Sequence, residues 1–277
     1  MHGRDHNSDV ATLQGKSVII FGTGSVGSTV AELLAKSGIG NITLVDPQRL
    51  ETENISRHAL GATSIGERKA SAQARSLAER FPHLTIDGVD QTCQTFANTA
   101  FERIHSADLV ISTIGEWRSE TYLNAHVLDS KSFPPLLYGW TEPHATAGHA
   151  VALFPGTACL RCLTDGTGRP RLEVTAWPAE GTMRPVPACG GLFQPYGAVE
   201  LTHVHALIAD LALDVLLGQV EQSTHRVWIG SRKLLDRFGG KWDPAWTTRY
   251  GDPAAGGTLT EIAVKKDPAC PECGGVG

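Results

Sequence analysis

Residues 17–27 read SVIIFGTGSVG, and this stretch decides the fold class. It begins with a continuous apolar run, which is typical of a strand buried on both faces of a parallel sheet. Gly22, Gly24 and Gly27 then form the pattern Gly-x-Gly-x-x-Gly, and a helical pattern follows at residues 26–37. Glycines in such a turn let the backbone approach phosphate, and the helix N-terminus offers free N–H groups. The stretch therefore predicts a nucleotide-binding unit.

The next expected strand, residues 41–45, ends at Asp46. A carboxylate at this place can accept hydrogen bonds from two ribose hydroxyls. Both a dinucleotide and ATP carry such a ribose, so the glycine pattern and Asp46 do not separate these two ligands.

Strand and helix patterns alternate through the first half of the chain. Further helices are expected at residues 67–81, 96–105 and 118–130, and further strands at residues 84–87, 108–113 and 135–140. This alternation predicts a Rossmann-like α/β fold, with a mostly parallel sheet and helices on both faces.

The pattern changes in the second half. Residues 148–154 read as a strand that extends the sheet, in an antiparallel direction. Residues 155–196 are rich in glycine and proline and are expected to form a mobile crossover loop, because loops of this size inside a compact domain are usually functional or mobile. Residues 198–217 form a strongly apolar pattern that predicts a buried helix.

Length and charge limit the classes of protein to which this chain can belong. The chain has 277 residues and a net charge of −5, so its charge does not indicate a surface that binds nucleic acid. No apolar run is long enough to span a bilayer, and residues 1–15 form a polar arm without a signal core. We therefore expect a single cytoplasmic domain over residues 1–277, with no nucleic-acid or membrane partner.

Residues 241–277 show little periodicity and are expected to form a tail.

Four cysteines form two Cys-x-x-Cys pairs: Cys159 with Cys162, and Cys270 with Cys273. In a reducing compartment this pattern favours metal over disulfides. Two pairs supply the four thiolates of a tetrahedral zinc site, which would clip the tail to the body. The alternative is a redox pair, but a redox site would not need a second pair.

Basic residues follow Asp46 closely, among them Arg57, Arg68 and Lys69. A triphosphate attacked at its α-phosphorus needs such charges, because negative charge develops on the transferring and leaving oxygens. A dehydrogenase has no such need. The alternative reading, a solvated helix start, stays open on these residues alone.

The chain resembles the ThiF/MoeB/HesA superfamily of ubiquitin-activating-like enzymes. The resemblance rests on GTGSVGS (22–28), LVDPQRLETENISRH (44–58) and IGERKA (65–70), and it covers roughly residues 15–275. The Arg-His pair and the run GWTEPHATAGHA (139–150) most resemble bacterial ubiquitin-activating-like proteins. Some of those occur in anti-phage operons, fused to or encoded beside a conjugating enzyme.

The resemblance implies roles for particular residues. Asp46 would bind the ribose of ATP, and Asn54, Arg57 and Lys69 would bind its phosphates. Cys189, in the run PACGG, stands where family members often carry a cysteine that forms a thioester or persulfide. A ubiquitin-like or sulfur-carrier protein is the implied partner, and a homodimer is the implied assembly.

The sequence departs from the family in two places. The family usually has Asp-Asn where this chain has Gly115-Glu116, and that Asp helps to hold Mg²⁺, a role that Glu116 would have to take. Many relatives begin with two helices whose arginine completes a neighbouring subunit's site, and Arg4 matches it poorly. The chain is either one domain of a longer protein or takes this arginine from elsewhere.

Three functions remain to be separated. The first is ATP-dependent adenylation of a carrier's C-terminal carboxylate, followed by thioester formation on Cys189. The second is an NAD-dependent oxidoreductase, which leaves Arg57, Lys69 and the cysteine pairs unexplained. The third is a non-catalytic scaffold of the same fold, which the Gly115 departure allows.

Overall fold

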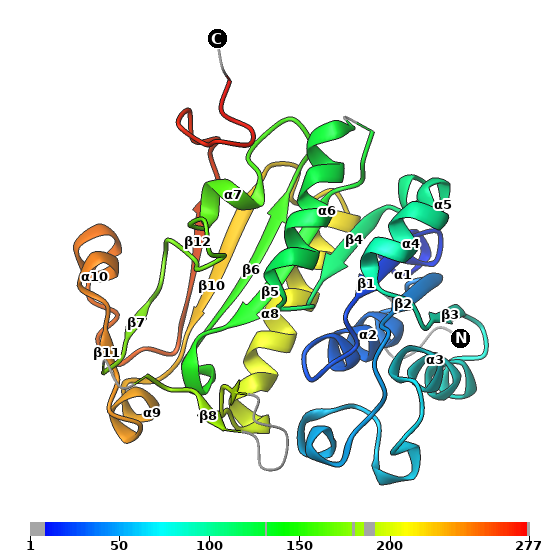
Figure 1. Cartoon of the computed structure of the whole chain (residues 1–277), viewed down its shortest axis with the longest axis horizontal. Helices are drawn as coiled ribbons and strands as arrows, with labels where there is room; N and C mark the ends of the chain where they lie inside the picture. Colours follow the sequence, from blue (N-terminus) through cyan, green and yellow to red (C-terminus); the bar gives the residue numbers. More distant parts are fainter. Residues whose placement is uncertain (1–8, 131, 179–180, 186–191, 276–277) are drawn as a thin grey trace.

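The computed structural model describes residues 9–130, 132–178, 181–185 and 192–275. An eight-stranded sheet forms its centre, in the order β12-β10-β6-β5-β4-β1-β2-β3, with helices on both faces (Figure 1). The predicted Rossmann-like α/β fold with an antiparallel extension is confirmed. Across the described ranges, every helix is too short or too polar to cross a membrane.

The parallel half of the sheet contains the nucleotide-binding unit. Its strands are β1 (Ser17–Phe21), β2 (Asn41–Val45), β3 (Thr85–Val89), β4 (Leu109–Ser112) and β5 (Leu136–Thr141). All five run parallel, in the order β3-β2-β1-β4-β5. The strand order reverses between β1 and β4, and open α/β sheets bind ligands at such a point.

Three antiparallel strands extend the sheet beyond β5. They are β6 (Ala147–Leu153), β10 (Thr224–Ile229) and β12 (Thr258–Ala263). The antiparallel direction expected for residues 148–154 is correct. Residues 241–277, expected to form a tail, contain β12, which pairs with β10 along its whole length.

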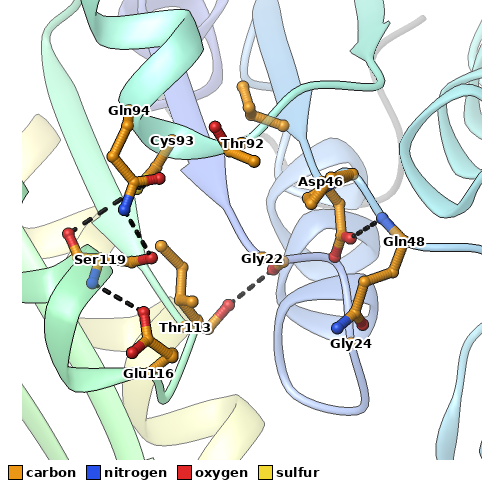
Figure 2. Close-up of a pocket in the computed structure, with 13 residues that line it drawn as sticks. Gly22, Gly24, Asp46, Gln48, Thr92, Cys93, Gln94, Thr113, Glu116 and Ser119 are labelled. Atoms are coloured by element: carbon orange, nitrogen blue, oxygen red, sulfur yellow. Dashed lines mark hydrogen bonds between the residues drawn. The ribbon is translucent and has the colours of Figure 1, made fainter.

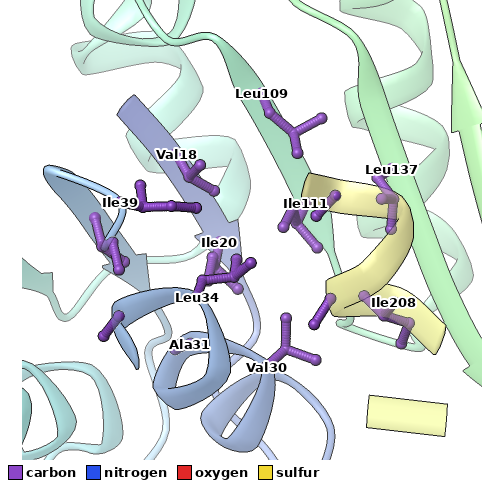
Figure 3. Close-up of a cluster of buried hydrophobic side chains, with 14 of the residues drawn as sticks. Val18, Ile20, Val30, Ala31, Leu34, Ile39, Leu109, Ile111, Leu137 and Ile208 are labelled. Atoms are coloured by element: carbon purple, nitrogen blue, oxygen red, sulfur yellow. The ribbon is translucent and has the colours of Figure 1, made fainter. Parts of the chain in front are cut away.

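One face of the sheet is covered by α2 (Gly27–Lys36), α3 (Lys69–Arg80) and α8 (Ala198–Leu216). Helix α8 is the buried apolar helix that the sequence predicts, and its Ile208 packs in the same cluster as β1, β4 and β5 side chains (Figure 3). A Cβ on Gly139 would lie 2.3 Å from Ile208, so this glycine allows α8 to approach β5.

The other face carries α4 (Cys93–Thr99), α5 (Phe101–His105), α6 (Trp117–Asp129) and α7 (Leu160–Leu163). The single helix expected at residues 96–105 is two helices. The chain breaks between them at Ala100, whose φ of −128° and ψ of 35° are not helical. A second buried cluster lies between these helices and the sheet.

The crossover segment is irregular over most of its described length but contains short strands. Within it, β7 (Thr175–Ala176) pairs with β11 (Lys241–Trp242), and β8 (Arg184–Pro185) pairs with β9 (Leu192–Phe193). The remaining short elements are α1 (Asp9–Gln14), η1 (Thr52–Arg57), η2 (Ala62–Ser64), η3 (Pro143–Ala145), α9 (Arg232–Arg237) and α10 (Pro244–Tyr250). A third apolar cluster joins α9, α10 and β11 to β10.

Candidate functional site

The glycine loop, residues 22–27, joins β1 to α2 and is shaped by backbone sterics. Gly22 has a φ of +87°, a conformation that favours glycine. A Cβ on Gly27 would lie 1.9 Å from the carbonyl oxygen of Gly22, so no side chain fits there. The Thr113 hydroxyl donates to the same carbonyl at 2.8 Å. A Cβ on Gly24 would meet nothing within 4 Å, so the loop is open to a ligand there.

A cavity of about 230 Å³ opens where β1, β2 and β4 end (Figure 2). This is the point where the strand order reverses, and we call it the glycine-loop cavity. Its lining includes Gly22, Gly24, Asp46, Gln48, Thr113 and Glu116. Gly22, Gly24 and Asp46 therefore meet at one opening, whereas Gly27 lies outside its lining.

Asp46 is only 5% exposed and holds the glycine loop in place. Its Oδ2 accepts hydrogen bonds from the amide and the hydroxyl of Thr23, at 2.7 Å and 3.2 Å. Its Oδ1 accepts one from the amide of Gln48 at 2.8 Å. A carboxylate can accept about four such bonds, so Asp46 keeps room for about one more.

His58 holds the glycine loop through a hydrogen bond to its backbone. The sequence did not predict this contact. The Nδ1 of His58 accepts a hydrogen bond from the amide of Leu60 at 3.0 Å. Its Nε2 therefore carries the hydrogen and donates to the carbonyl of Thr23 at 2.7 Å. Burial lowers the pKa of His58 below its usual value, which keeps the ring neutral.

Arg57 packs on an aromatic ring that contacts the glycine loop. Its guanidinium carbon is 4.7 Å from the centre of the Tyr196 ring, a cation–π distance. The Tyr196 hydroxyl lies 2.8 Å from the hydroxyl of Ser25 in the glycine loop. Within the described residues, the buried Nε of Arg57 meets no hydrogen-bond partner. Tyr196 was not predicted, and its role depends on the crossover segment folding back over the loop.

None of the three carried-over phosphate ligands, Asn54, Arg57 and Lys69, lines the glycine-loop cavity. The Nζ of Lys69 is buried and donates to Oε1 of Gln48 at 2.7 Å, so it reaches the cavity through a lining residue. The Oδ1 of Asn54 accepts a hydrogen bond from the amide of Glu51 at 3.1 Å, within a capping box of η1.

Glu116 lines the glycine-loop cavity and caps α6 (Figure 2). Its two oxygens accept hydrogen bonds from the amides of Arg118 and Ser119, at 3.1 Å and 2.8 Å. Hydrogen bonds from Ser119 lower the pKa of Glu116, so this carboxylate is ionised at neutral pH. It is thus available to a cation, although two of its acceptor sites are in use.

A second carboxylate near the cavity, that of Glu120, was not predicted from the sequence. Its Oε1 accepts hydrogen bonds from the Ser112 hydroxyl and the Gly115 amide, each at 3.2 Å. Desolvation raises its pKa to about 7. Glu120 lines an adjacent aromatic cavity of about 190 Å³ with Trp117, Tyr138, Trp140 and Pro170. Its place in the first turn of the helix expected at residues 118–130, just after Glu116, is the signal that could have revealed it.

The two cysteine pairs meet between α7 and the C-terminal segment. The sulfur of Cys159 lies 4.0 Å from that of Cys162 and 3.7 Å from that of Cys270, and the sulfurs of Cys162 and Cys273 are 3.3 Å apart. All four lie within 4.8 Å of one another. A tetrahedral zinc site with bonds of about 2.3 Å needs sulfurs about 3.8 Å apart, so this candidate metal centre fits zinc.

Asn124 links α6 to both halves of this centre. Its side-chain amide donates to Glu272 at 2.7 Å, and its oxygen accepts a hydrogen bond from the amide of Leu160 at 2.7 Å. The helix that begins at the glycine-loop cavity is therefore tied to the cysteine cluster. Cys189, the expected thioester residue, lies outside the described residues.

The family model described as the ThiF family matches residues 6–226. In Pseudomonas aeruginosa, the ATP-dependent ubiquitin transferase-like protein Cap2 is 27% identical over 270 residues, covering 95% of this chain and 43% of that protein. Ubiquitin-like modifier-activating enzyme 5 of Arabidopsis thaliana is 28% identical, covering 80% of this chain and 52% of the enzyme. The chain thus spans about half, or less, of the length of these relatives.

Solved structures of E. coli MccB share the fold. MccB with ATP aligns with a TM-score of 0.62 at 17% identity, covering 96% of this chain and 68% of that one. MccB with MccA-N7isoASN aligns with a TM-score of 0.65 at 16% identity, with 96% and 69% coverage.

Proposed function

This chain belongs to the ThiF family, and we propose that it uses ATP to adenylate the C-terminal carboxylate of a ubiquitin-like or sulfur-carrier protein. One observation carries the proposal: Arg57, whose Nε meets no hydrogen-bond partner in the part of the chain that the structure describes, packs on Tyr196, which contacts a glycine loop that is open at Gly24. The relatives support it, because they include a ubiquitin transferase-like protein and a ubiquitin-like modifier-activating enzyme. Family membership also favours adenylation over the dehydrogenase reading.

In this proposal the nucleotide occupies the glycine-loop cavity. Gly22, Gly24 and Gly27 allow the phosphates to approach the backbone, and Asp46 accepts a hydrogen bond from the ribose. Arg57 and Lys69 neutralise the phosphates, with Asn54 as a further donor. Lys69 would exchange its bond to Gln48 for one to a phosphate, a small side-chain movement, since Gln48 lines the cavity.

Catalysis of this reaction depends on the positioning of the reactants and on neutralisation of their negative charge more than on proton transfer. An oxygen of the ionised carboxylate attacks the α-phosphorus and forms the new O–P bond. The bond from the α-phosphorus to the bridging oxygen breaks, and pyrophosphate leaves with the electron pair. Both nucleophile and leaving group are anionic, so Arg57 and Lys69 lower the barrier by offsetting their charge.

The residues also fit two metals. Glu116 would hold Mg²⁺, which supplies charge neutralisation on the phosphates. Cys159, Cys162, Cys270 and Cys273 would hold Zn²⁺, whose task is structural because four thiolates complete its coordination.

We further propose that Cys189 takes the acyl group from the adenylate as a thioester, releasing AMP. A conjugating enzyme would accept the acyl group next, and a homodimer is the expected assembly. Both follow from the family resemblance rather than from any contact seen in this chain.

ATP–pyrophosphate exchange tests the proposal. A small β-grasp protein that co-purifies with this chain and ends in glycine is the substrate to use. Carrier-dependent exchange of labelled pyrophosphate into ATP is expected. A chain that binds the carrier without exchange would be a scaffold, and NAD-dependent absorbance changes would indicate an oxidoreductase.

A further inference from the structure

Two buried histidines hold the backbone of the glycine loop. Nε2 of His58 lies 2.7 Å from the carbonyl oxygen of Thr23, and Nε2 of His205 lies 2.9 Å from that of Ser25. The two histidines come from different elements, since His58 follows η1 and His205 belongs to α8. They are 9% and 5% exposed, so little water competes for either bond.

Both rings donate these hydrogen bonds. A carbonyl oxygen only accepts, so each Nε2 carries a hydrogen. Burial lowers the pKa of His58 below its usual value, and it lowers the pKa of His205 to about 4. Both rings are therefore neutral at neutral pH, and they act on the loop as hydrogen-bond donors rather than as charges.

The two bonds fix the direction of two peptide groups. In a trans peptide, the C=O and the N–H point in opposite directions. Because the Thr23 carbonyl points at His58, the amide of Gly24 points away from His58. The amide of Val26 points away from His205 for the same reason. Neither amide has a hydrogen-bond partner in the segments that the structure describes, so both are left for a ligand.

The same two residues of the loop are fixed at a second point each. Oδ2 of Asp46 accepts a hydrogen bond from the amide of Thr23 at 2.7 Å, and the Tyr196 hydroxyl lies 2.8 Å from that of Ser25. Anchored carbonyls therefore alternate with free amides along the loop. Amide donors that are held in advance stabilise phosphate charge without having to reorient when the ligand arrives.

We propose that His58 and His205 are positioning residues of the nucleotide site. Each holds a carbonyl of the glycine loop so that the following amide, of Gly24 or Val26, donates to a phosphate of ATP. This inference rests on the proposed function. Without its histidine, a carbonyl loses its donor and turns outward to regain a hydrogen bond from water. That rotation puts a partially negative oxygen where the phosphates bind.

Equilibrium dialysis of the full chain with radiolabelled ATP or adenosine, in the presence of Mg²⁺, tests these roles. His58→Leu and His205→Leu each remove a donor and should bind ATP about tenfold more weakly. Their affinity for adenosine should be unchanged, because adenosine carries no phosphate. His203→Leu is the matched control, since His203 lies on the exposed side of α8 and stacks on Trp228. It should bind both ligands like the wild type.

Glutamine variants separate the donor from the packing of the ring. The amide nitrogen of glutamine lies as many bonds from Cα as Nε2 of histidine, so His58→Gln and His205→Gln keep the donor. Both should bind ATP about as tightly as the wild type, with thermal unfolding showing that they are folded.

Nuclear magnetic resonance of the ¹⁵N-glycine-labelled wild type tests the free amide directly, whether or not a leucine variant folds. ATP should shift the amide signal of Gly24, and adenosine should not. Gly24→Ala identifies this signal by its loss, and a Cβ there meets nothing within 4 Å.

An unchanged ATP affinity in a folded leucine variant would overturn the role of its histidine. Equal losses for ATP and adenosine would do the same, as would a folded glutamine variant that binds ATP as weakly as its leucine counterpart. A Gly24 signal that ATP does not shift would overturn the proposal as a whole.

Exchange of pyrophosphate into ATP with the carrier separates this inference from the proposed function. Leucine variants that bind ATP like the wild type, while exchange continues, contradict the histidine roles and leave adenylation standing. A selective loss of ATP binding in the leucine variants, with no exchange in the wild type, supports the histidine roles and contradicts adenylation.

Discussion

The guanidinium carbon of Arg57 lies 4.7 Å from the ring centre of Tyr196. The same tyrosine meets Ser25 in the glycine loop through its hydroxyl, at 2.8 Å. The end of the crossover segment thus holds a cation beside the glycine loop, with its buried Nε unpaired among the described residues. This arrangement suits a site that neutralises phosphate.

Arg57→Ala and Lys69→Ala should each lower the rate of ATP–pyrophosphate exchange by about 100-fold or more, because each removes a charge that acts in the transition state. Arg75→Ala is the matched control, since Arg75 is exposed and pairs only at the surface with Glu67. All three variants should keep the wild-type circular dichroism. If Arg57→Ala and Lys69→Ala exchanged pyrophosphate as fast as Arg75→Ala, neither residue would belong to the nucleotide site.

Metal analysis should find one zinc per chain. Cys162→Ser should lose it, whereas Cys93→Ser should keep it, because Cys93 lies outside the cluster. A chelator should lower the melting temperature by roughly 10 °C without unfolding the domain, since the core is large and only the tail and α7 are clipped. A metal-free wild type with four titratable thiols in the cluster would contradict the zinc site.

Cys189→Ala should still form the adenylate with ATP and the carrier but should form no thiol-sensitive adduct. Cys93→Ser, which changes least in a side chain that lines the glycine-loop cavity, should form the adduct normally, because burial raises the pKa of Cys93 and keeps its thiol protonated. Non-reducing electrophoresis with and without thiol measures this. An adduct and onward transfer in Cys189→Ala would show that another group accepts the acyl chain.

Glu120 should make stability depend on pH. Its pKa is raised from 4.5 to about 7, so the folded state keeps a proton that the unfolded state has lost between these values. The stabilisation is therefore complete below pH 4.5 and is lost as the pH rises to about 7, by about 3 kcal/mol at most. Glu120→Gln should flatten the decline in stability between pH 5 and 8, measured by urea unfolding. Equal slopes in wild type and variant would show that Glu120 is not the cause.

The sequence predicted the centre of the parallel half because β1, β2 and β4 are largely apolar and buried, whereas β3 is polar in part and only half-buried. It missed β12 because TLTEIA alternates weakly and forms an exposed edge strand. The cysteine cluster could be expected from paired spacing alone. By contrast, the contacts of Tyr196 with Arg57 and of His149 with His225 join distant segments, and no local pattern encodes them.

In the proposed reaction, a carboxylate oxygen of the substrate bonds to the α-phosphorus of ATP. The most direct measurement uses a carrier labelled with ¹⁸O in its C-terminal carboxylate. Hydroxylamine attacks the acyl carbon of the adenylate, so AMP leaves with the bridging oxygen. We expect AMP that carries one ¹⁸O atom, detected by mass spectrometry, and little AMP from Arg57→Ala. AMP without ¹⁸O, formed at the same rate with and without carrier, would contradict it.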